Sequence, residues 1–140
     1  MALIPALFTH TKANVPSVSN RVYGVIAPQG VTKPYVVFQV ISNNFSHAMG
    51  GDDGLTQTRV QFSVWGSGYG QVKGVAEELK AAYRNYIEGD SDEKMGMASD
   101  GTGGHWVQTA LLDNETDVYE NDTGLYGTHL DIIFWHREVD

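Results

Sequence analysis

A glycine-rich stretch lies between an apolar run and a helix-like pattern at residues 64–79, VWGSGYGQVKGVAEEL. Glycine-rich loops that open a helix can bind phosphate through their backbone N–H groups. The dinucleotide-binding pattern G-x-G-x-x-G needs a third glycine where this chain has Gln71, and the G-K-[ST] ending of a P-loop is missing. The flanking runs alternate as antiparallel strands do, whereas phosphate loops belong to parallel βαβ units. The stretch is therefore predicted to be a strand-to-helix turn, in which Gly66 and Gly68 supply backbone freedom.

The residue types that most often carry catalysis or bind metals are not spaced for either task. The chain has no cysteine, which excludes thiolate zinc sites and cysteine nucleophiles. No pair among its five histidines has the H-E-x-x-H spacing, and Ser67 lacks the G-x-S-x-G spacing of a nucleophile elbow. His129 and Asp131 could project from one face of a strand, but surface or interface roles are favoured over a metal site. We expect no enzyme, no cofactor and no metal.

An acidic segment at residues 113–124, DNETDVYENDTG, follows part of the calcium-loop pattern. Asp113, Glu115 and Asp117 alternate as calcium ligands do. Val118 stands where such a loop needs glycine, and no glutamate falls at the twelfth position. A weak cation site stays open as an alternative, and an acidic, solvated hairpin arm is favoured.

The composition is that of one globular domain with a strong acidic bias. The 140 residues are 41% hydrophobic and 19% charged, with nine basic against seventeen acidic residues and a formal charge of −8. The sequence has no cluster of basic residues that could bind the phosphate groups of a nucleic acid, so specific binding to nucleic acid is disfavoured. Passage of DNA close by, without adhesion, stays possible. No apolar run approaches the length of about 18 residues that a membrane span needs.

Hydrophobic periodicity predicts an α+β fold. We expect a short N-terminal helix, strands near 22–26, 34–42, 55–65, 105–112 and 125–138, and a long helix at about 70–88. The predicted arrangement is an antiparallel sheet of about four to five strands with the long helix packed on one face. Residues 1–140 are expected to form one domain with long loops at about 43–54, 88–104 and 113–124, and an open hairpin is the alternative for 43–54.

Three segments follow one another along the chain: RVYGVIAPQGVTKPYVVFQVIS, LTQTRVQFSVWGSGYGQVKGVAEELKAAY and TDVYENDTGLYGTHLDIIFWH. Together they resemble the tail-completion (tail-terminator) proteins of long-tailed bacteriophages. Their order and spacing carry the resemblance, since each alone is only a strand, turn or helix. The segment 88–104 departs from the family's pattern because it is long and glycine-rich. The resemblance therefore implies no particular contacts for this segment.

This resemblance implies a virion structural protein at the head–tail junction, assembled in the host cytoplasm. It would form a homo-oligomeric ring, usually of six, on the head-proximal end of the tail tube. There it would stop tube growth and join the tail to the head connector. The implied partners are other copies of the chain, the major tail tube protein and a head-completion or connector protein, with no membrane involved.

Aromatic and acidic residues are the candidate interface residues of such a ring. The aromatic candidates are Trp106, Tyr119, Tyr126 and Trp135, with a core role as the alternative for the two tryptophans. The acidic candidates are Asp52, Asp53, Glu115, Asp117, Glu120 and Asp122. Six copies would carry a formal charge of −48, six times −8, and acidic residues facing the lumen would repel DNA so that it passes without specific binding.

Two rival interpretations remain. One is another neck or head-completion ring protein of the same particle, and the other is a small cytoplasmic binding module unrelated to phages.

Overall fold

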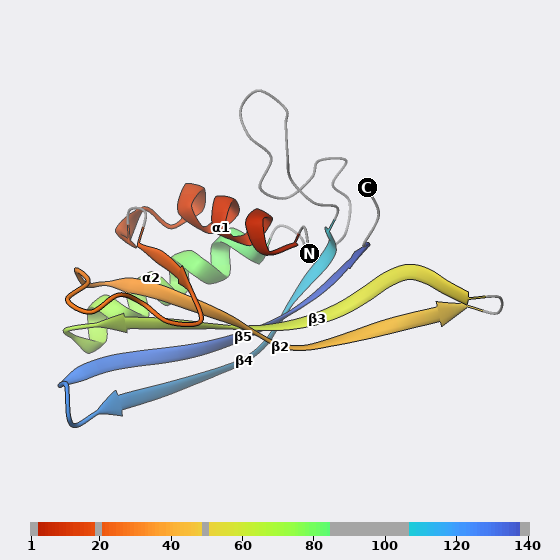
Figure 1. Ribbon diagram of the computed structural model, residues 1–140. Coiled ribbons are helices and arrows are strands. Elements are labelled where there is room, and N and C mark those ends of the chain that lie inside the picture. Colours follow the sequence, from red (N-terminus) through yellow and green to blue (C-terminus); the bar gives the residue numbers. More distant parts are fainter. Residues whose placement is uncertain (1–2, 19–20, 49–50, 85–106, 138–140) are drawn as a thin grey trace.

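The computed structural model describes residues 3–18, 21–48, 51–84 and 107–137 (Figure 1). The elements, in chain order, are helix α1 (Leu3–Asn14), a 3-10 turn (Pro16–Val18), strands β1 (Val22–Gly24), β2 (Tyr35–Ala48) and β3 (Gly51–Gly66), helix α2 (Tyr69–Arg84), and strands β4 (Val107–Glu120) and β5 (Leu125–Arg137). The strands form one sheet in the order β1-β2-β3-β5-β4. The α+β class predicted from periodicity is confirmed.

The sheet is mixed, so the prediction of a purely antiparallel sheet is wrong. Strand β1 pairs parallel with β2, whereas every other neighbouring pair is antiparallel. The segment 25–34 joins these two strands and returns the chain to the starting end of the sheet. Hydrophobic alternation reports which face of a strand is buried and does not encode the direction of its neighbour.

Both helices cover the same face of the sheet, and the core lies between them and the strands (Figure 1). Residues at every second position of three neighbouring strands are buried, as the alternation predicts. They are Val36 and Phe38 on β2, Val60, Phe62 and Val64 on β3, and Leu130, Ile132 and Phe134 on β5. The ring of Phe62 lies at the centre, with centroids 5.3 Å from Tyr83 and 5.9 Å from Phe38.

Helix α2 buries the apolar stripe that its periodicity predicts. The buried residues are Val72, Val75, Ala76, Leu79, Ala82 and Tyr83. The helix has 16 residues, so the long helix predicted at 70–88 is not confirmed as such; residues 85–88 lie outside the described residues. Helix α1 has 12 residues and matches the short N-terminal helix predicted.

The glycine-rich stretch is the corner between β3 and α2. Gln71 Oε1 accepts a hydrogen bond of 3.1 Å from the backbone N–H of Ser67, which satisfies a donor at the helix start. A Cβ atom at Gly66 would lie 2.7 Å from this same Oε1 and 2.9 Å from Val72 Cγ2. Gln71 therefore caps the helix where a dinucleotide fingerprint would have glycine, and the prediction of a turn is confirmed.

Two of the segments predicted as long loops are largely strand, in agreement with the open hairpin left as the alternative for 43–54 and the hairpin arm favoured for 113–124. Residues 43–48 continue β2 and residues 51–54 open β3, while 113–120 continue β4 up to a turn at 121–124. Their polar side chains predict loops, but pairing with a neighbouring strand satisfies the backbone whatever the side chains are. The third predicted loop, 88–104, lies outside the described residues, as do the first two residues of the strand predicted at 105–112.

Candidate assembly interface

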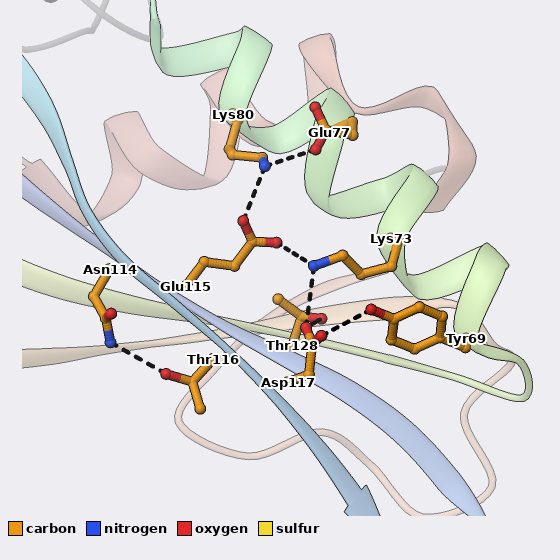
Figure 2. Close-up of polar contacts among 9 residues, drawn as sticks. All are labelled: Tyr69, Lys73, Glu77, Lys80, Asn114, Glu115, Thr116, Asp117 and Thr128. Carbon is orange, nitrogen blue, oxygen red and sulfur yellow. Dashed lines mark hydrogen bonds and ion pairs between the residues drawn. The ribbon is translucent and has the colours of Figure 1, made fainter.

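A network of ion pairs joins α2 to the edge strand β4 (Figure 2). Glu115 and Asp117 are two residues apart on β4, so both side chains point to the helix face of the sheet. Lys73 and Lys80 lie two helical turns apart on one side of α2 and meet them. Glu115 accepts hydrogen bonds from both lysines, and the Lys80 Nζ to Glu115 Oε1 distance is 2.9 Å. The carboxylate of Glu115 is thus held between two ammonium groups.

Asp117 extends this network toward the start of α2. Its Oδ1 lies 3.1 Å from Lys73 Nζ and accepts a hydrogen bond of 3.0 Å from Thr128 Oγ1. Its Oδ2 accepts a hydrogen bond of 2.9 Å from the Tyr69 hydroxyl. Hydrogen bonds from Lys73, Tyr69 and Thr128 lower the pKa of Asp117, and those from Lys73 and Lys80 lower the pKa of Glu115. Both groups are therefore carboxylates at neutral pH, with their charge largely neutralised within the chain.

A second ion pair spans the uncovered face of the sheet. Arg59 on β3 contacts Asp113 Oδ2 at 2.5 Å and Asp131 Oδ2 at 3.6 Å, reaching across β5 to β4. Asp113 lies where the register of β4 against β5 shifts, between Leu112 and Asn114. Such a bulge turns a side chain away from its regular direction, which allows Asp113 to meet the guanidinium.

A group of three tyrosines lies at the end of the sheet next to the β4–β5 turn. The rings of Tyr119 and Tyr126 lie side by side on the two strands, tilted by 56° with centroids 4.9 Å apart, and the ring centroid of Tyr69 on α2 lies 6.4 Å from that of Tyr126. The side chains of Tyr119 and Tyr69 are about half exposed, at 53% and 52%. Exposed aromatic side chains held by their neighbours lose little conformational entropy on binding, so this group is suited to protein contact.

No described element covers the other face of the sheet, which holds a shallow groove of about 450 Å³. Trp65 lies on its floor beside His129, with ring centroids 5.8 Å apart, and Ser63 Oγ lies 2.7 Å from His129 Nδ1. Gly127 leaves room for the Trp65 ring, because a Cβ atom there would lie 2.7 Å from it. Val25 and Ile26, 70% and 78% exposed, form one wall.

The Ser63–His129 pair lacks the third member of a catalytic triad among the described residues. Asp131 follows His129 by two positions, but its Oδ2 faces Arg59 and its buried Oδ1 has no hydrogen-bond partner in the described part of the chain. A serine is activated by a histidine that an acid orients. Within the same residues, no group of three or more histidine, aspartate or glutamate side chains gathers to hold a metal ion.

Comparison with known families decides what kind of protein this is. The sequence model of the family described as "Tail completion protein gp17" matches residues 2–137. The chain belongs to the tail completion protein family. This is a family of phage virion components, in agreement with the resemblance seen in the sequence.

A solved structure adds a relative in fold. The tail completion protein resembles a chain from a structure titled "Virion of native gene transfer agent (GTA) particle", with a TM-score of 0.58 and 13% sequence identity. The similarity covers 91% of this chain and 84% of that one. A comparison with curated proteins gives no match. Among the described residues of this tail completion protein, no helix has the length and apolar character to cross a membrane.

The candidate interface residues of the tail completion protein fall into separate places. Tyr119, Tyr126, Glu120 and Asp122 gather near the β4–β5 turn, where Glu120 accepts a hydrogen bond of 3.3 Å from Thr123 and Asp122 is exposed. Asp52 and Asp53 lie in the first residues of β3, at the opposite end of the sheet (Figure 1); their side chains are not described. Trp106 lies outside the described residues.

Glu115, Asp117 and Trp135 have surroundings that the sequence did not predict. The two acids contact α2, and Trp135 is half-buried on the uncovered face, outside the hydrophobic core. Lys73 and Lys80 were missed as partners of the acids. The seven-residue spacing of these lysines on one helix face was a signal for a shared contact, although not for its location.

Proposed function

We propose that this tail completion protein forms a ring of six on the head-proximal end of the tail tube. There it stops tube polymerisation and joins the tail to the head connector. The family match over residues 2–137 carries the proposal, and the resemblance described above supplies the ring, the tube end and the connector. The likeness to a chain of a gene transfer agent virion supports the fold of such a subunit.

The internal contacts suit a subunit that works by presenting a fixed shape. The α2–β4 network and the Arg59 ion pairs tie the helix layer and the outer strands into one unit. Histidine, serine and acidic side chains that could serve chemistry are used in contacts within the chain. A rigid subunit presents its contact surfaces without a large entropic cost of ordering on assembly.

The charge distribution refines how DNA would pass through such a ring. Asp113, Glu115 and Asp117 face cations of their own chain, so they add little to repulsion at a distance. Glu120 and Asp122 form no ion pair with the described residues and are exposed at the β4–β5 turn. We therefore assign the repulsion of DNA phosphates to exposed acidic residues such as Glu120 and Asp122, and we propose that they line the lumen of the ring.

The decisive experiment is electron microscopy of particles from a parent phage or prophage with an early stop codon in this gene. Filled heads without tails beside tubes of uncontrolled length are expected, because the protein would both cap the tube and join it to the head. Tails of normal length that fail to attach would assign it to a neighbouring neck component instead. Normal infectious virions would contradict the proposal.

A further inference from the structure

Within the described residues, the sheet has two edges that are unpaired for most of their length and face in opposite directions. At one edge, β1 pairs with β2 only along Val36–Phe38. From Gln39 to Ala48, no described strand pairs with the outer side of β2. At the other edge, the outer side of β4 is unpaired among the described strands along Val107–Glu120. A row of unpaired backbone N–H and C=O groups is a template for pairing with another strand.

The edge of β2 lacks the charges and prolines that usually prevent such pairing. Residues 35–51, YVVFQVISNNFSHAMGG, contain no charged residue and no proline, in a chain that is 19% charged. A two-stranded ribbon is marginal alone in water, and beyond Leu55, which pairs with Arg137, β3 has only β2 beside it in the described sheet. This end of the sheet is therefore suited to completion by another chain.

The edge of β4 differs in charge from the edge of β2. Asp113, Glu115, Asp117 and Glu120 lie along this strand. Two β4 edges brought together would place acidic residues opposite each other, which is unfavourable. The uncharged edge of β2 imposes no such repulsion. The two edges are therefore better partners for each other than β4 is for itself.

Exposed apolar side chains are concentrated on the same two strands. Seven large apolar side chains are exposed among the described residues, and four of them lie on β2 and β4. They are Ile41 (48% exposed) and Phe45 (57%) on β2, and Leu111 (40%) and Tyr119 (53%) on β4. Ile41 lies at a bulge, between the paired residues Val40 and Ser42, and a bulge re-aims a side chain.

The register places one exposed apolar residue of each edge, Ile41 and Leu111, at nearly the same height. Ser42 pairs with Arg59, Arg59 with Ile133, and Ile133 with Leu111, in one row across the sheet. The bulged Ile41 is next to this row. A second copy set beside the first, without a shift along the strands, would bring its Leu111 to the height of Ile41.

Strand direction also agrees with a ring of identically oriented copies. Three successive antiparallel pairs, β2–β3, β3–β5 and β5–β4, make β4 run opposite to β2. A neighbour in the same orientation therefore presents β4 antiparallel to β2. A contact between two different surfaces of one chain is the kind that closes into rings.

We propose that the free edge of β2 in one copy of this chain pairs antiparallel with the free edge of β4 in the next copy, with Ile41 beside Leu111. This inference rests on the ring of the proposed function and names the contact that builds it.

Disulfide trapping tests the contact, since the chain has no cysteine of its own. Ile41→Cys and Leu111→Cys are combined in one chain and oxidised in solution at concentrations where native mass spectrometry shows the ring. Residues facing each other across paired strands bring their Cβ atoms within about 5 Å, close to what a disulfide needs. The expected result is a ladder of cross-linked species up to the full ring, while each single variant stays monomeric on a denaturing gel.

Three results of this experiment would overturn the contact. Dimers from Ile41→Cys alone would show that β2 pairs with β2. A ring in native mass spectrometry without cross-links in the double variant would place the interface elsewhere and leave the proposed function standing. A chain that stays monomeric at every concentration would also overturn the contact, while the stop-codon phenotype still tests the function independently.

A charge placed on the β2 edge gives a second test. Phe45→Lys should raise the protein concentration needed for ring formation by about tenfold or more, because a buried unpaired lysine opposes association. Ile26→Lys is the matched control, since Ile26 is 78% exposed and lies outside β2 and β4. Equal effects of both variants, with circular dichroism unchanged, would contradict the proposal.

Discussion

The hydroxyl oxygen of Tyr83 on α2 lies 2.6 Å from Thr11 Oγ1 on α1, and both side chains are fully buried. This hydrogen bond joins two helices that are far apart in sequence. Beside it, His10 Nε2 lies 2.6 Å from the carbonyl oxygen of Ala82. Together the two contacts fix α1 against the end of α2.

Loss of the Thr11 hydroxyl is expected to destabilise the fold. Thr11→Val should lower the free energy of unfolding by about 1–3 kcal/mol, because the buried Tyr83 hydroxyl loses this partner. Urea unfolding followed by circular dichroism measures the change. Thr9→Val is the control on the same helix, since Thr9 is exposed and its hydroxyl donates to the carbonyl of Pro5 within its own helix. Equal losses from both variants would contradict the assignment.

The α2–β4 network is expected to make stability depend on pH in the acidic range. Hydrogen bonds from Lys73 and Lys80 lower the pKa of Glu115 below its ordinary value of 4.5. A lowered folded-state pKa gives stability that is present above the unfolded value and is lost as pH falls through the folded value. The free energy of unfolding should therefore decline below about pH 4.5.

Glu115→Gln should reduce that decline and lower stability at pH 7 by about 0.5–1 kcal/mol, since the side chain is partly exposed. Unfolding in urea from pH 2.5 to 7 measures both effects. Asp122→Asn is the control, because the exposed Asp122 carboxylate forms no ion pair with the described residues. A pH profile unchanged by Glu115→Gln would contradict a stabilising role of the network.

Two glycine substitutions should shift stability in opposite directions. A Cβ atom at Gly127 would lie 2.7 Å from Trp65 and 3.0 Å from Val118, so Gly127→Ala should cost about 1–3 kcal/mol and change the tryptophan fluorescence. At Gly74, on the exposed side of α2, the added Cβ would meet no described atom within 4 Å beyond its chain neighbours and the helix's own backbone. Gly74→Ala should therefore stabilise by about 0.5–1 kcal/mol. Stabilisation by Gly127→Ala would show that the Trp65 ring can move aside.

Reversal of the charge at Glu120 should slow the passage of DNA if this end of the sheet faces the lumen. Glu120→Lys changes the net charge by +2, and so does the pair Ala13→Lys with Ala81→Lys, at exposed positions on the two helices. Particles with Glu120→Lys should eject DNA several-fold more slowly at low salt, with the difference shrinking as salt screens the charges. Ejection kinetics followed by a DNA-binding dye measure this. Equal rates in both variants would remove Glu120 from the lumen.

The sequence predicts those features that depend on local periodicity. The alternation of Val60, Phe62 and Val64 and the stripe from Val72 to Tyr83 each report burial on one face, and the structure confirms both. The glycine-rich corner was predictable for the same reason, since Gln71 breaks the nucleotide pattern within five residues of Gly66. These features need no knowledge of distant partners.

Features set by long-range contacts could not be read in this way. Lys73 and Glu115 are 42 residues apart in sequence, so Glu115 and Asp117 read as part of a solvated arm although they contact α2. The polar residues 43–48 read as a loop because their strand pairing is a backbone property. The parallel direction of β1 depends on the path of the segment 25–34, which periodicity does not describe.

The composition of the β2 edge also determines the heat capacity change expected when another strand pairs with it. Residues 39–48 are mostly polar, with Ile41 and Phe45 as the exposed large apolar side chains among those described. Pairing would form many backbone hydrogen bonds and would remove apolar surface from water mainly at Ile41 and Phe45, so the heat capacity change of association should be smaller than for an apolar interface of the same area. We expect such an association to lose less strength on cooling than one that depends on the hydrophobic effect alone.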